Sequence, residues 1–256
     1  MSPINPFDLE IIAKAKAALE ADSMALRLNN YVGKKLDGAV KKLPDAWQSQ
    51  LSKGINYSLS KATEWAFATT GSRECPFLRD DWMHMVGVLG SGFLGGAGGF
   101  STVLWELPAS TMIMMRSIGC IAEKEGLNMS DPKTRLGCVS VLAMGADPKR
   151  VQSDELGYWV TRKAMAGLVT KVLEWNGRGT VPPLVQFITK TAARFGVVIS
   201  EKVAAQVAPG VGALAGAGIN GIYLNHYQNV AHAHFSIERL CMTYGETSVK
   251  EAYASI

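Results

Sequence analysis

The chain has 256 residues, and 48% of them are hydrophobic, which is enough for a large buried core and excludes a disordered chain. Only 19% are charged, below the roughly 25% that is usual for soluble proteins. The formal net charge of +4 comes without a nucleic-acid motif, so we expect no DNA or RNA partner, whereas attraction to anionic lipid remains compatible with it.

The first ten residues, Met1–Glu10, lack the basic segment and apolar run of a secretory signal. We therefore expect a cytoplasmic protein. If it contacts a membrane peripherally, it does so at the inner face.

The first strongly patterned segment is a basic amphipathic helix that begins near Leu28. Its apolar positions lie three or four residues apart, which places them on one helical face. Four lysines lie away from that face: Lys34, Lys35, Lys41 and Lys42. The pattern is typical of a surface helix docked on its own core, and it also suits contact with a membrane surface.

Further helices follow along the chain, whereas alternating β-branched runs are scarce. The capping and breaking residues predict helices over residues 44–70, from Ser101 or Thr102 to Ile121, from Asp131 onward, and from Ser153 to about Trp175. Pro108 either kinks its helix or marks its first turn. The fold class predicted is all-α, as one multi-helix domain over 1–256, with a basic helical region at 1–75 and a core at 80–255.

Two segments without charged residues are rich in glycine, Trp82–Trp105 and Val203–Tyr223. Each is long enough to cross a bilayer, but glycine adds little apolar surface. Gly212, Gly216 and Asn220 lie four residues apart, the arrangement that lets two helices approach closely. We expect tightly packed Gly-rich helices, with a membrane-inserting or interfacial segment as the alternative.

No cofactor or metal is predicted from the motifs. The G-x-G-x-x-G pattern from Gly90 to Gly95 lacks the strand, crossover and acidic residue of a dinucleotide site. Four cysteines, Cys75, Cys120, Cys138 and Cys241, are scattered, so we expect neither a disulfide framework nor a zinc knuckle, and a reducing compartment.

Several polar residues in the apolar second half are candidates for chemistry. His234 and Glu238 are four residues apart on one helix and could supply two metal ligands, while His226 lies too far from His234 to share an ion. Glu106 and Arg116 are opposite charges in an apolar region, where we expect each to pair with the other or with another helix. A buried Glu106 with a raised pKa could alternatively act as an acid.

The run from Pro209 to Gly245 resembles the C-terminal signature of EcsC family proteins, and the run from Leu107, with Asp131–Pro132, resembles the family's central segment. The resemblance extends from about Gly87 to Tyr253 and implies no particular reaction. On matching positions it nominates Glu106, Arg116, Asn220, His226, His234 and Arg239 as a polar site. The chain departs from the family pattern at residues 231–233 and at Cys241.

Three functions remain open. The first is peripheral association with membrane or lipid without catalysis, with Arg116, Asn220 and Arg239 as ligand-binding residues. The second is a peptidase-like hydrolase, either metal-dependent or metal-free, with Glu106, His226, His234 and Glu238 as catalytic candidates. The third is a helical interaction module that binds a membrane protein or a second copy of the chain through its Gly-rich faces.

Overall fold

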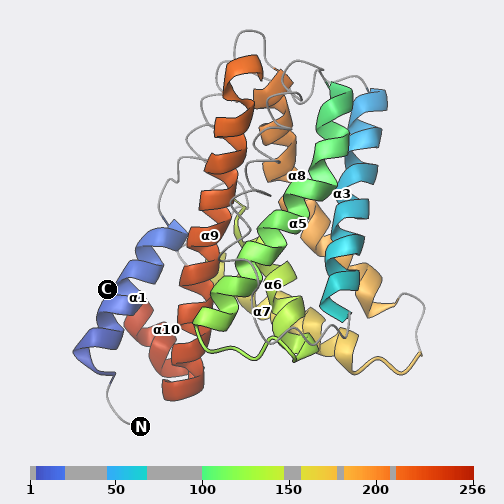
Figure 1. Ribbon diagram of the computed structural model, residues 1–256. Helices are drawn as coiled ribbons and strands as arrows, with labels where there is room; N and C mark the ends of the chain where they lie inside the picture. The colour runs from blue at the N-terminus through green and yellow to red at the C-terminus, as the bar shows by residue number, and fades with distance from the viewer. Residues whose placement is uncertain (1–3, 21–44, 68–99, 147–156, 178–181, 208–211) are drawn as a thin grey trace.

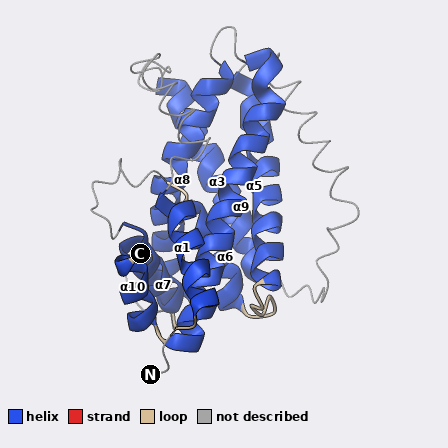
Figure 2. Ribbon diagram, turned by 90° about the vertical axis from the view of Figure 1, so that its left-hand side faces the viewer, coloured by secondary structure: helices blue, strands red, loops and turns tan. Residues whose placement is uncertain are grey.

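The computed structural model describes residues 4–20, 45–67, 100–146, 157–177, 182–207 and 212–256. This part of the chain forms eight helices and no strand (Figure 1, Figure 2), which confirms the all-α class. The helices are α1 (Pro6–Glu20), α3 (Asp45–Phe67), α5 (Phe100–Lys124), α6 (Pro132–Met144), α7 (Gly157–Leu173), α8 (Pro183–Val207), α9 (Gly212–Tyr244) and α10 (Glu246–Ser255).

Helix α3 follows the expected apolar spacing. Leu51, Ile55 and Leu59 are four residues apart and all are buried. This face packs against α5, α6 and α8, so the periodicity identifies the side of α3 that faces the bundle.

Helix α6 begins where the capping residues predict. The Asp131 side chain accepts a hydrogen bond of 2.8 Å from the Lys133 backbone N–H, and Pro132 occupies the first turn. Helix α5 ends shortly before Gly126, which adopts a φ of 84° that favours glycine. Pro108 lies inside α5 rather than at its start.

The buried side chains form two hydrophobic cores. The larger joins α3, α5, α6, α7, α8 and α9, with Met115, Leu142, Phe195 and Tyr227 among its fully buried members. The smaller joins α1, the start of α7, the end of α9 and α10. Helix α9 runs through both cores, with α1 and α10 against its C-terminal end (Figure 1).

Helices α7 and α8 belong to the same domain although a linker-like stretch separates them. Both pack against α6 and against each other.

The packing of Gly212 and Gly216 lies outside the described side-chain environments, so tight packing along that face stays a prediction. A Cβ atom built on Gly218 or Gly221 of α9 meets no described atom within 4 Å. The closely packed glycine is Gly145 at the end of α6, where a Cβ would collide with the Tyr227 ring. Gly145 therefore makes room for side chains of α9 at the end of α6.

Some predictions fall outside the described residues: the basic helix with Lys34, Lys35, Lys41 and Lys42, the Gly90–Gly95 motif, most of Trp82–Trp105, and the start at Ser153. Among the cysteines, Cys138 and Cys241 are free thiols. Cys120 is disulfide-bonded, which runs against the expected reducing compartment.

Candidate functional site

A cavity of about 610 Å³ lies between α6, α7 and the C-terminal end of α9, closed at one end by the first turn of α10. Its size is within the range typical of small-molecule sites. The charged residues that line it are Asp131, Lys133, Arg162, Lys163, Glu238 and Glu246. His234 also lines it, so two of the candidate residues, His234 and Glu238, share this cavity.

Arg162 organises the charged end of the cavity. Its guanidinium donates hydrogen bonds of 2.6 Å to Glu238 of α9 and 2.7 Å to Glu246 of α10, and it lies 5.5 Å from the Trp159 ring centre. Burial disfavours the charge, but the two carboxylates raise the pKa of Arg162 above its ordinary value. The arginine therefore stays charged and ties three helices together.

His234 is a neutral hydrogen-bonding group. Its side chain is buried, and burial lowers its pKa to about 4. Nδ1 lies 3.0 Å from the Tyr158 hydroxyl, whose pKa burial raises. We assign the hydroxyl as the donor to Nδ1, because the described residues offer it no other acceptor, and this assignment places the ring proton on Nε2. Nε2 is thus a donor on the side of the ring away from Tyr158.

Glu238 is ionised at neutral pH. Burial alone would raise its pKa, but the Arg162 guanidinium, with His234 and Lys133, holds it below the ordinary value. A carboxylate in this state accepts hydrogen bonds and does not donate a proton. Nearby Cys241 is also unreactive, because burial raises the pKa of its thiol to about 11.

Glu106 and Asn220 meet in a second place, inside the larger core. Lys202 Nζ of α8 lies 3.3 Å from Glu106 Oε1 of α5, and the Asn220 amide of α9 donates to the same oxygen. Burial lowers the pKa of Lys202, although Glu106 opposes this shift. Glu106 thus pairs with another helix, one of the two arrangements expected. Arg116 lies ten residues further along α5, and its side chain is exposed.

His226 lies apart from both clusters. Its Nε2 donates a 2.7 Å hydrogen bond to the backbone carbonyl of Gly145, and burial lowers its pKa. The ring is held against Tyr227 in the larger core. Its hydrogen bond joins α9 to the end of α6, which is a structural role.

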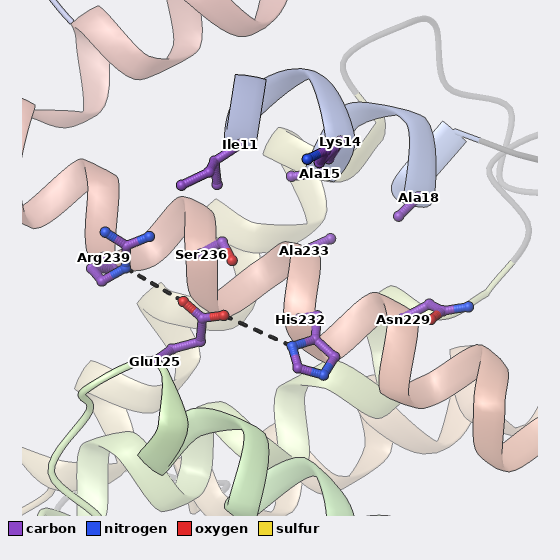
Figure 3. Close-up of a pocket in the computed structure, with 10 residues that line it drawn as sticks. All are labelled: Ile11, Lys14, Ala15, Ala18, Glu125, Asn229, His232, Ala233, Ser236 and Arg239. Carbon is purple, nitrogen blue, oxygen red and sulfur yellow. Dashed lines mark hydrogen bonds and ion pairs between the residues drawn. The ribbon is translucent and has the colours of Figure 1, made fainter. Parts of the chain in front are cut away.

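Arg239 lines a hollow of about 430 Å³ beneath α1 (Figure 3). Glu125 reaches between two residues of α9: its Oε2 lies 3.4 Å from Arg239 Nε and its Oε1 lies 3.8 Å from His232 Nδ1. Lys14 and Ile11 of α1 form the opposite side of the hollow. The candidate residues are therefore divided among four places, with Arg116 on the surface as a fifth.

Sequence reasoning missed Arg162, Lys202 and Tyr158. The two cations carried a signal, because each occupies a position on the buried stripe of its helix. Arg162 follows Trp159 and precedes Met165 at three-residue steps, and Lys202 follows Ile199 by three. Their glutamate partners are 76 to 96 positions away in sequence and have no local pattern. No sequence signal marks Tyr158.

Within the described part of the chain, no helix has both the length and the hydropathy needed to cross a membrane. In that same part, no three His, Cys, Asp or Glu side chains come together as metal ligands.

The fold and the cavity define an all-helical protein with a cavity of mixed charged and apolar lining between α6, α7 and α9. Comparison with known families matches residues 86–240, more than half of the chain, to the EcsC protein family, so the chain belongs to that family. No curated protein and no solved structure shows a significant match.

Proposed function

We propose that this EcsC family protein associates peripherally with lipid at a membrane surface and acts by binding rather than by catalysis. One observation carries the proposal: the cavity joins exposed lysines at its rim to an apolar wall, while the polar groups inside are held in unreactive states. An apolar wall beside cationic side chains suits an amphiphilic ligand and an anionic surface.

The cationic rim consists of Lys133 at the start of α6 and Lys163 on α7, both exposed. Each lysine near an anionic bilayer contributes about 1 kcal/mol of attraction, which salt screens. Arg162 is not part of this attraction, because two glutamates neutralise it.

The hydrolase hypothesis draws less support from the geometry. His226 is bonded to Gly145 in the larger core, while His234 and Glu238 are in the cavity with their protonation states fixed as neutral and ionised. General acid or base catalysis is most effective with a pKa near the working pH. A neutral histidine with a pKa of about 4 and a clamped carboxylate suit ligand binding better.

Flotation with liposomes tests the proposal. The wild-type protein should float with anionic vesicles at low salt and less at high salt, and float little with neutral vesicles. Replacing both Lys133 and Lys163 with glutamate should abolish flotation. A matched control makes the same replacement at Lys190 and Lys250, exposed lysines that do not line the cavity.

An equal loss in both double variants would assign the effect to net charge and count against the cavity rim. No flotation of the wild-type protein with anionic vesicles at low salt would overturn the proposed function.

A further inference from the structure

We propose that the cavity between α6, α7 and α9 binds one net-neutral, single-chain amphiphile, whose headgroup oxygen accepts a hydrogen bond from His234 Nε2. The inference rests on the proposed function, because it names the ligand class of the same cavity. It adds the charge of the headgroup, the residue that recognises it and the wall that holds the chain.

The charge of the lining selects a neutral or zwitterionic headgroup. Three cations (Lys133, Arg162 and Lys163) are balanced by three carboxylates (Asp131, Glu238 and Glu246). His234 adds no charge, since burial lowers its pKa to about 4. A zwitterion can place its anionic group beside Lys133 and Lys163 and its cationic group beside the two glutamates of Arg162, whereas a ligand with one charge finds a partner in only one of these places.

His234 supplies the point of recognition. It is 5% exposed, it lines the cavity, and its Nδ1 is occupied by Tyr158. The proton on Nε2 has no acceptor among the described residues. Nε2 is not among the fully buried atoms that lack a partner, so it is accessible from the cavity, and an oxygen atom of the ligand can accept its hydrogen bond.

The apolar part of the lining gives the chain of the amphiphile a wall. Leu127, Met144, Val169, Phe235 and Met242 all line the cavity. Two glycines, Gly137 of α6 and Gly167 of α7, line it as well, and a Cβ atom on either would meet no described atom within 4 Å. The space above these glycines is open to an alkyl chain.

The test is calorimetric titration with three amphiphiles of the same chain length below their micellar concentrations. Dodecylphosphocholine is zwitterionic, dodecyl phosphate is anionic and dodecyltrimethylammonium is cationic. The zwitterion should bind with one site per chain and about tenfold more tightly than either charged amphiphile, because the charged ones leave a charge uncompensated in the lining. Equal affinities for the three, or binding to many sites, would overturn the inference.

Variants of the cavity make the test specific. Gly167→Leu fills the open space and should remove the single site, while Gly218→Leu, on an exposed helical glycine outside the cavity, should leave it unchanged. His234→Phe should weaken binding about tenfold, the effect of an unsatisfied hydrogen-bonding group. His234→Gln keeps an N–H donor and should restore most of the affinity.

If His234→Phe does not fold, Gly167→Leu still tests the inference, because this substitution is at an exposed position and should not prevent folding. Unchanged binding in Gly167→Leu would overturn the inference.

The flotation assay separates this inference from the proposed function. If vesicles bind and dodecylphosphocholine does not, the proposed function stands and the ligand assignment fails. If dodecylphosphocholine binds at one site and vesicles do not, the ligand assignment stands and the action at a membrane surface fails.

Discussion

Lys202 and Arg162 are both buried cations that contact glutamate, yet their surroundings differ. Lys202 and Glu106 are 4% and 3% exposed, and they meet at one distance of 3.3 Å. Glu106 Oε2 and Asn220 Oδ1 have no hydrogen-bond partner among the described residues. Arg162 instead forms two short bonds, to glutamates that are 32% and 55% exposed.

A contact between a buried cation and a glutamate therefore serves two different purposes in this protein. In the larger core, removing Lys202 and Glu106 from water costs more free energy than their single long contact regains. The pair therefore fixes which helix faces meet and does not add stability. At the cavity, the glutamates keep part of their hydration, and the arginine holds the geometry of a binding site.

The largest expected effect comes from breaking the buried Lys202–Glu106 pair. Lys202→Met leaves Glu106 as an uncompensated buried carboxylate and should lower the free energy of unfolding by about 3–5 kcal/mol. The double variant Lys202→Met with Glu106→Leu should recover most of that loss, because an apolar pair needs no compensation. Urea denaturation of the single and double variants gives both values. A double variant no more stable than the single one would contradict this account of the cluster.

A second prediction concerns acid stability at the cavity. The pKa of His234 is about 4 in the folded protein and about 6.5 in the unfolded chain, so the unfolded chain takes up a proton first as pH falls. The stability that neutral His234 contributes is complete above pH 6.5 and is lost progressively down to pH 4, by at most about 3 kcal/mol.

Urea denaturation between pH 7 and pH 4 measures this loss, and His234→Gln isolates it. His226 also has a lowered pKa and contributes in both proteins, so the difference between them reports on His234. Parallel stability curves for the wild type and His234→Gln would show that His234 is not held neutral.

The smallest effect is expected at the exposed end of the cavity cluster. Glu246→Gln removes one of the two carboxylates from Arg162, but Glu246 is 55% exposed and Glu238 remains. Thermal unfolding should report a loss within about 1 kcal/mol, as for exposed ion pairs. A loss as large as that of Lys202→Met would remove the distinction between the two clusters.

The local features of the fold were predictable from the sequence, and the long-range pairings were not. The stripe of Leu51, Ile55 and Leu59 and the cap at Asp131 depend on residues within a few positions, so their patterns can be read directly. The choice of Lys202 for Glu106 depends on how α5 and α8 pack, which no local spacing encodes. Likewise, His226 and His234 are on one helix, but His226 bonds to Gly145 inside the larger core and His234 lines the cavity.

Helix α9 has 33 residues and therefore extends about 50 Å. Because its side chains belong to both cores, neither core can come apart while the other holds the whole helix in place. Hydrogen exchange should therefore find the amides in the middle of α9 among the slowest, opening only when the entire domain unfolds. The two cores would then behave as one cooperative unit.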